Sequence, residues 1–200
     1  MRTEASIESN APRPESARDK ILGAAMELFY RQDIHTVGVD AIIAKAGVAK
    51  MSFYRHFPAK DDLVRAFLEE QDRRYWQWWD GVMAEHAGDP RRQLLALFEA
   101  ISVRLLRPSY RGCAFINFTA EFAQAEHPGY PVVTANKREQ RARLLGLSSQ
   151  LGARQPELLA DQLMLLIEGA RVSMLTLGAE GPASTLGQSA AALMDAALVR

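Results

Sequence analysis

The chain has 200 residues, of which 48% are hydrophobic, and its 24 lysines and arginines balance its 24 aspartates and glutamates. This length allows one ordinary domain or two small ones with a real core. Because the net charge is about zero, any surface that binds a polyanion must concentrate its positive charge locally. The single cysteine, Cys113, excludes an intrachain disulfide and favours a reducing compartment, so we expect a cytoplasmic protein.

The first 15 residues are predicted to form a disordered arm. They are rich in Pro, Ser and Glu and lack the apolar run of a signal peptide. The most apolar stretch of the chain, residues 159–178, is interrupted by Asp161, Glu168 and Arg171, so it is not expected to span a membrane.

Three short helices are predicted next, over residues 16–32, 39–47 and 50–57. Ser16 is a suitable N-cap for the first, with Asp19 three residues later as in a capping box. Gly47 can end the second helix in the left-handed conformation. Two short helices joined by a glycine-containing turn predict a helix-turn-helix, which Pro58 terminates.

Longer helices are predicted in the rest of the chain, and no alternating strand pattern or internal repeat is found. The fold is therefore expected to be all-α. A three-helix domain over residues 16–60 should precede a larger helical domain over residues 61–200. The expected helices of that second domain cover residues 60–86, 91–106, 113–125, 131–151, 155–177 and 184–199.

The segment GVAKMSFYRHF, residues 47–57, mixes aromatic and basic side chains. Phe53 and Phe57 are four residues apart and should face the core. Lys50 and Ser52 can donate to bases or phosphates, and the hydroxyl of Tyr54 can bond phosphate. From spacing alone, an ordinary amphipathic helix with a solvated basic face is as good an interpretation as a helix that reads DNA.

The segments ILGAAMELF and VDAIIAKAGVAKMSFYRHFPAKDDLVRAF, within residues 17–68, resemble the DNA-binding domain of the TetR family. The resemblance implies a homodimeric transcriptional regulator, usually a repressor, that a small-molecule inducer releases from an inverted-repeat DNA operator. It also implies dimerisation through the last two helices, about 155–177 and 184–199. Residue by residue, the match implies that Lys50, Met51, Ser52 and Tyr54 face bases and that Tyr54, His56 and Lys60 contact or orient toward phosphates. Arg55, on the same helix, is predicted to contact DNA as well.

Several positions depart from the family pattern. Ala49 and Ala59 stand where a polar cap is usual before a helix, and Gly38 stands where Ser or Thr often caps the second helix. Asp33 replaces the usual Gly after the first helix. Because Ala in place of a Ser or Thr cap costs roughly 0.5–2 kcal/mol, a DNA-binding module of reduced local stability is expected.

The predicted helix 113–125 has two contrasting faces. Phe115, Phe118 and Phe122 share one face, which favours core packing, and Cys113, Asn117 and Glu121 share the other. If both faces are buried, Asn117 and Glu121 need partners. A ligand pocket or a neighbouring helix can supply them, and the sequence favours neither.

The predicted ligand is of medium size and largely apolar or aromatic. The residues expected to line its pocket are Trp79, Phe98, Ile101, Cys113, Asn117, Phe118, Glu121, Phe122, Leu163 and Ile167. For Trp79, core packing is the more common role of such a residue.

Cys113 has two interpretations, as a small buried residue or as a sensor of oxidants and electrophiles. Its place after Gly112 at a predicted helix N-terminus, beside Arg111, favours the thiolate that a sensor needs.

Two further functions are weaker alternatives. No metal site, cofactor site or enzyme is expected, because the four histidines are scattered and no zinc or phosphate-binding motif occurs. A Cys113 nucleophile with His127 as base has no support from spacing. A helix-turn-helix protein acting only through protein contacts remains the other alternative.

Overall fold

The structure, a computed structural model, describes residues 15–122 and 126–198. Within these ranges the chain forms nine α-helices, one 3-10 turn and no strand, which confirms the all-α prediction. The helices are α1 (Ala17–Arg31), α2 (Val39–Ala46), α3 (Lys50–His56), α4 (Lys60–Ala84), α5 (Pro90–Leu105), α6 (Ala114–Glu121), α7 (Tyr130–Gln150), α8 (Pro156–Leu177) and α9 (Leu186–Leu198), with the 3-10 turn η1 at Pro182–Thr185.

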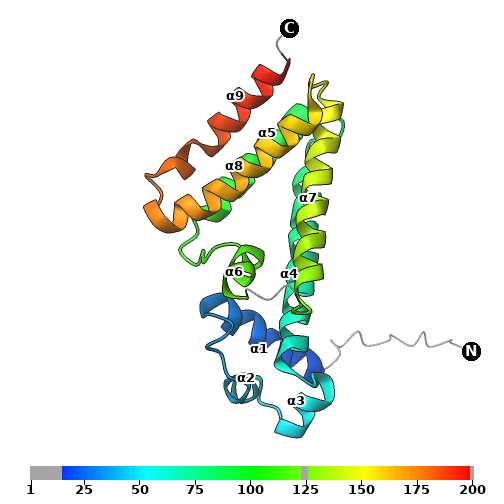
Figure 1. The fold of residues 1–200 in the computed structure, drawn as a ribbon, viewed down its shortest axis with the longest axis vertical. Helices are drawn as coiled ribbons and strands as arrows, with labels where there is room; N and C mark the ends of the chain where they lie inside the picture. The colour runs from blue at the N-terminus through cyan, green and yellow to red at the C-terminus, as the bar shows by residue number, and fades with distance from the viewer. Residues whose placement is uncertain (1–14, 123–125, 199–200) are drawn as a thin grey trace, which may run out of the picture.

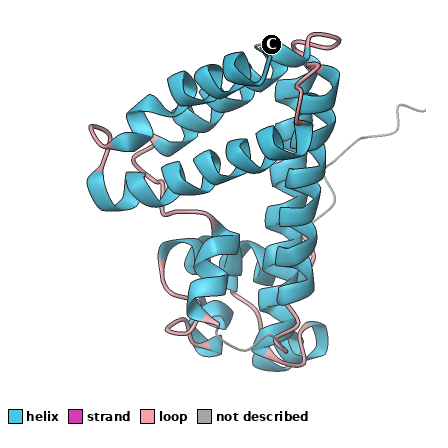
Figure 2. Cartoon of the chain, turned by 45° about the horizontal axis from the view of Figure 1, so that its top comes forward, coloured by secondary structure: helices cyan, strands magenta, loops and turns pink. Residues whose placement is uncertain are grey.

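The long helices α4 and α7 form a spine that joins two groups of helices (Figure 1). Helices α1–α3 gather at one end of this spine, and α5, α8 and α9 pack at the other. Helices α4 and α7 run in the same direction, because Asn136 bonds Asp72 at 2.9 Å and Arg143, about two turns further along α7, pairs with Asp80, about two turns further along α4. Helix α6 lies between the two groups, and in the described residues the helices are connected by loops and, between α8 and α9, by the turn η1 (Figure 2).

Helices α2 and α3 form the predicted helix-turn-helix. Gly47 ends α2 at φ 62°, a left-handed conformation that glycine adopts without steric cost. Phe53 and Phe57 are buried as predicted, at 0% and 3% exposure. They pack in one core with Ile21 and Ala25 of α1, so α1 holds α3 against the body of the module.

The hydrophobic core of the N-terminal module continues beyond residue 60. Besides α1–α3 and the first half of α4, it contains Phe115 and Phe118 of α6 and Val133 of α7. A second core joins the rest of α4 and α7 to α5, α8 and α9. Helix α6 therefore packs with the N-terminal helices, although it follows α5 in the chain.

Some predicted segments differ from the structure or fall outside it. The helix predicted over residues 113–125 ends at Glu121, because Phe122 is already extended at φ −106° and ψ 100°. Residues 123–125 lie outside the described residues. So do residues 1–14 of the predicted arm and residue 199 of the predicted last helix.

The helix N-termini of the module are unequally capped. At α1, the Ser16 hydroxyl accepts from the Asp19 backbone N–H, and the Asp19 carboxylate accepts from Ser16 N–H, which is a full capping box. The caps of α2 and α3, Gly38 and Ala49, make no side-chain bond. At α4 only half of a box forms, because Ala59 N–H donates to Asp62 but Ala59 has no side-chain acceptor.

Replacing Ala49 by Ser should stabilise α3. Ala49 already has the extended conformation of an N-cap, at φ −70° and ψ 146°, so a serine hydroxyl can accept from the free N–H groups of the first turn without rearrangement. We expect Ala49→Ser to raise the free energy of unfolding by about 0.5–2 kcal/mol and to slow hydrogen exchange in α3.

The control is Ala49→Val, which adds side-chain volume but no acceptor and should give no such gain. Equal protection of α3 in the serine variant and the unaltered protein would contradict the capping argument.

Candidate functional site

The exposed face of α3 carries the residues predicted to contact DNA. Met51 is 80% exposed and Tyr54 is 42% exposed, whereas Phe53 between them is fully buried. The Lys50 ammonium lies 3.1 Å from Asp40 of α2, and both side chains are largely exposed. Arg55 donates to Ser52 at 3.4 Å on the same surface, and His56 is half-buried. The structure therefore brings six of the seven predicted residues together on one short helix.

Lys60, the seventh, has a different environment. Its ammonium donates to the carbonyl oxygens of Ile34 at 2.5 Å and His35 at 3.4 Å. Burial lowers the pKa of Lys60 from its ordinary value. Lys60 thus holds the α1–α2 loop against the start of α4, and its assignment as a phosphate contact stays a prediction.

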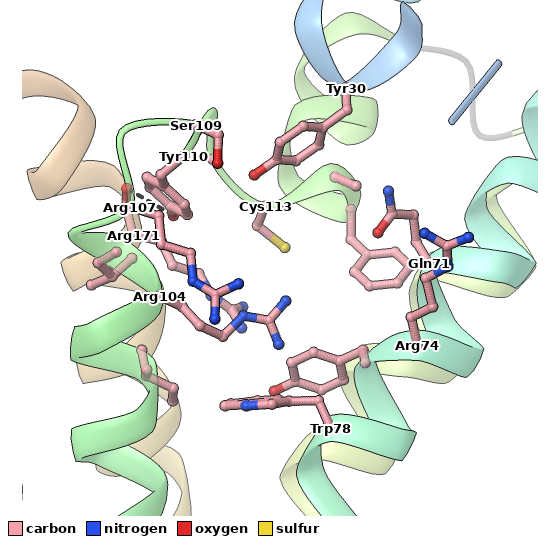
Figure 3. Close-up of a pocket in the computed structure, with 16 residues that line it drawn as sticks. Tyr30, Gln71, Arg74, Trp78, Arg104, Arg107, Ser109, Tyr110, Cys113 and Arg171 are labelled. Atoms are coloured by element: carbon pink, nitrogen blue, oxygen red, sulfur yellow. Dashed lines mark hydrogen bonds between the residues drawn. The ribbon is translucent and has the colours of Figure 1, made fainter. Parts of the chain in front are cut away.

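A pocket of about 260 Å³ lies between α4, α5, α8 and the loop that leads into α6 (Figure 3). Arg104, Arg107 and Cys113 point toward its centre, with Tyr30 on one side and Trp78 on the opposite side. Its lining residues are Tyr30, Gln71, Arg74, Tyr75, Trp78, Ile101, Arg104, Leu105, Arg107, Ser109, Tyr110, Gly112, Cys113, Ala114, Phe115 and Arg171.

Of the ten residues predicted to line a ligand pocket, Ile101 and Cys113 line this one. Five others are at most 1% exposed and pack in the two cores: Trp79, Phe98, Phe118, Leu163 and Ile167. Trp78, the neighbour of Trp79, is the tryptophan that faces the pocket. Sequence reasoning also missed the pocket arginines, although Arg171 interrupts the most apolar stretch of the chain and could have indicated a buried charge.

The remaining three predicted ligand residues have protein partners. The Asn117 amide donates to the Arg111 carbonyl at 2.9 Å, and Glu121 accepts from the His35 backbone N–H at 3.1 Å. The Phe122 ring stacks on His35 with centroids 4.2 Å apart. Asn117 and Glu121 also border a separate, more open hollow of about 330 Å³ beside α1. Of the two alternatives for these polar residues, the structure shows pairing with neighbouring segments.

Charge in the pocket is strongly one-sided, because four arginines and no carboxylate line it. Two of the four are paired with carboxylates outside the lining. Arg74 lies 2.6 Å from Glu70, and Arg171 lies 2.9 Å from Glu168, which also binds Lys137 at 2.7 Å. Arg104 instead stacks on Trp78, with its guanidinium carbon 4.4 Å from the ring centroid.

Helix α6 connects the pocket to the N-terminal module. Cys113, the N-cap of α6, lines the pocket. At the other end of the helix, Glu121 and Phe122 hold His35 in the α1–α2 loop. The His35 Nε2 atom lies 3.1 Å from the Glu121 carbonyl oxygen, to which it donates in the Nε2–H tautomer. A shift of α6 would therefore act on both ends at once.

Comparison with known proteins identifies the family. A family model described as bacterial regulatory proteins of the tetR family matches residues 21–67. These residues comprise most of α1, all of α2 and α3, and the start of α4. A putative TetR transcriptional regulator of Streptomyces avermitilis, sav143, is 30% identical in sequence. The two structures superpose with a TM-score of 0.78, over 92% of this chain and 100% of the sav143 chain. The chain belongs to the TetR family.

Two further relatives agree with this assignment. The TetR-family regulator SCO4454 from Streptomyces coelicolor is 29% identical and has a TM-score of 0.85, with 90% of this chain and 95% of that chain covered. The Escherichia coli regulator YjdC is 23% identical over 79% of this chain and 83% of its own length. As a TetR-family member, the chain is a helix-turn-helix, DNA-binding transcriptional regulator. No helix in the described parts of the chain is long and apolar enough to cross a membrane.

The turn between α6 and α7 holds a histidine in its neutral form. His127 is 8% exposed, and its Nδ1 accepts from the Gly129 backbone N–H at 3.0 Å, which requires an unprotonated Nδ1. Burial lowers the pKa of His127 from 6.5, and the nearby Asp61 carboxylate opposes this only partly. Folding therefore favours the neutral imidazole.

We expect the folded state to lose stability as the pH falls below about 6.5, because the unfolded chain then binds a proton that folded His127 does not. The variant His127→Asn isolates this effect, since an Asn side chain can accept from the N–H two residues on without titrating. Chemical denaturation at pH 7.5 and pH 5.5 should show that the free energy of unfolding falls less between these pH values in the variant than in the unaltered protein. Equal losses would contradict the assignment.

Proposed function

We propose that the chain acts in the cytoplasm as a homodimeric repressor, released from a palindromic operator when a small molecule enters the pocket. Residues 16–60 serve as its DNA-binding domain and residues 61–200 as its ligand-binding and dimerisation domain. One observation carries this proposal: α6 begins in the wall of a ligand-sized pocket and ends on the loop that positions the helix-turn-helix.

The DNA contacts are proposed to come from the exposed face of α3. Met51 and Tyr54 project from it, and Lys50, Ser52, Arg55 and His56 supply the hydrogen-bonding groups. In a helix-turn-helix the second helix enters the major groove and its early residues reach base edges. Asp40 holds Lys50 by an exposed ion pair, which is weak and can exchange for a phosphate or a guanine.

The dimer interface is proposed on α8 and α9. Large apolar side chains on α8 are exposed, among them Leu165 at 73%, Leu177 at 64% and Leu175 at 51%. A groove of about 790 Å³ runs between α8 and α9 and is mostly apolar, with Leu165, Leu166 and Leu193 in its lining. A contiguous apolar surface of this kind is typical of a protein interface, and two-fold DNA sites require two-fold proteins.

Release by the ligand is proposed to act through α6. Five residues of the loop before α6 line the pocket, and this loop leads directly into the helix: Arg107, Ser109, Tyr110, Gly112 and Cys113. A ligand that moves this wall moves Glu121 and Phe122, and with them the α1–α2 loop. In a dimer, the two α3 helices would then no longer match major grooves about 34–36 Å apart.

Selection of the purified chain on a random duplex library at near-physiological salt tests this function. Enrichment of one inverted repeat is the expected result, and the strength of binding should fall steeply with salt as phosphate contacts are lost. A folded protein that recovers no consensus would contradict the proposal and would favour action through protein contacts alone.

Leu165→Glu should give a monomer that binds the selected operator weakly. The substitution places a charge on the most exposed apolar residue of α8, where a partner subunit would bury it. Sedimentation velocity measures the mass, and fluorescence anisotropy measures operator binding.

Val103→Glu is the matched control, because Val103 is also apolar and 56% exposed but lies on α5, outside the groove. It should remain dimeric. A Leu165→Glu variant that stays dimeric would contradict an interface on α8. So would a Val103→Glu variant that loses dimerisation and operator binding to the same extent.

A thiol-based response is the second proposal for the same pocket. Cys113 is a free, half-buried cysteine whose side chain points into the pocket, and the Lys137 ammonium lies 3.9 Å from its sulfur (Figure 3). An electrophile bound in the pocket would meet this thiol, and the resulting adduct would occupy the start of α6.

Cys113→Ser tests the thiol response. The serine variant should keep operator binding but lose release by N-ethylmaleimide, and mass spectrometry should show one adduct on the unaltered chain. Release of the serine variant by the same reagent at the same rate would eliminate Cys113 as the sensor.

A further inference from the structure

The pocket contains a positive charge without a counter-charge. Arg104 is half-buried, and it forms no ion pair or hydrogen bond through its side chain with any residue that the structure describes. Its charged or titratable neighbours are Arg107, Arg171 and two tyrosines, so no carboxylate balances it. Burial lowers the pKa of Arg104, and the two neighbouring arginines lower it further.

Stacking on Trp78 leaves the donors of Arg104 available. The guanidinium carbon lies over the Trp78 ring, 4.4 Å from its centroid, and the side-chain N–H groups have no hydrogen-bond acceptor among the described residues. In Figure 3 the Arg104 side chain extends from α5 toward the centre of the pocket, with Arg107 beside it. This arrangement presents a planar fork of donors to whatever fills the space.

Tyr75 supplies a second, independent observation. Its side chain is only 9% exposed, it lines the pocket, and its hydroxyl has no hydrogen-bond partner among the described residues. Arg171 lies close enough to influence the hydroxyl, but no hydrogen bond of normal geometry joins them. Burial raises the pKa of Tyr75, so the hydroxyl stays protonated and can donate.

One part of the pocket lining is apolar. Trp78, Ile101, Leu105 and Phe115 form a wall that we call the apolar wall. A volume of about 260 Å³ lies just below the ~300–1,000 Å³ of typical ligand sites, which suits a small ligand of one or two rings. Arg104 and Arg107 form no ion pair with a described residue and can only donate, and the Tyr75 hydroxyl can donate as well, so the group that best complements them is an acceptor that carries negative charge.

We propose that the pocket binds a small planar organic anion, an aromatic carboxylate, with its carboxylate on Arg104 and the Tyr75 hydroxyl and its ring against the apolar wall. This assignment rests on the proposed ligand-responsive function and names the chemical class of the ligand. It adds a negative charge to the largely apolar or aromatic ligand expected from the sequence, because Arg104 and Arg171 are far apart in the chain and meet only through the packing of α5 with α8.

The test compares carboxylates with their neutral amides of the same shape. Benzoate, 2-naphthoate and indole-3-acetate, each paired with its carboxamide, are titrated into the purified 200-residue protein by calorimetry and by thermal unfolding. At least one carboxylate should bind about tenfold or more tightly than its amide, since hydrogen bonds to charged groups are the stronger ones. Carboxamides that bind equally well, or a set in which no carboxylate binds, would overturn the proposal.

Two variants assign the contacts. Arg104→Gln should remove the preference for the carboxylate. Tyr75→Phe should weaken carboxylate binding and, because it deletes a buried hydroxyl without a partner, should raise the melting temperature of the ligand-free protein. Arg92→Gln is the control, because Arg92 is an exposed arginine of α5 that pairs with Asp89 outside the pocket lining. This variant should change neither the preference for the carboxylate nor the melting temperature. A full carboxylate preference in Arg104→Gln would contradict the assignment.

Operator release separates this inference from the proposed function. A carboxylate that binds through Arg104 but leaves the operator complex intact would support the anion site and contradict the inducer role. A neutral aromatic compound that binds in the pocket and releases the operator would support the inducer role and overturn the anion site.

Discussion

The position of α6 is the constraint on which the two ends of the molecule depend. Phe118, in the middle of this helix, is fully buried in the core that also contains Phe53 and Phe57. Removing a phenylalanine from such a core costs roughly 3–5 kcal/mol, so α6 cannot leave the N-terminal module cheaply. Since Cys113 at its start lines the pocket, the same helix also forms part of the ligand site.

The loop before α6 is held tightly against this helix. Gly112 has φ 95°, and a Cβ atom there would lie 2.8 Å from the Asn117 side-chain oxygen. The Asn117 amide in turn holds the Arg111 carbonyl, so the loop folds tightly onto the first turn of the helix. A side chain at residue 112 would break this contact, which explains why glycine occupies the position. Displacement of the loop is therefore displacement of α6.

The sequence predicted the fold well because its signals are local. Gly47, Pro58 and the spacing of Phe53 and Phe57 identify the helix-turn-helix from neighbouring residues alone. The pocket could not be predicted in the same way. Arg104 and Arg171 are far apart in the chain, and only the packing of α5 with α8 brings them together. Periodicity also cannot show that, of the neighbouring Trp78 and Trp79, Trp79 is buried in the core and Trp78 lines the pocket.

The charge of the pocket and the position of α6 together define what a ligand must do. A ligand shifts an equilibrium only by the difference between its affinities for the two states. Trp78 and Tyr75 stand on the spine helix α4, and Arg104 stands on α5, near the end that leads into the loop. An anion that pairs Arg104 with Tyr75 is bound between the spine and this loop-bearing end. The affinity for this anion depends on the distance between α4 and the end of α5. The same distance determines the position of the loop and of the start of α6.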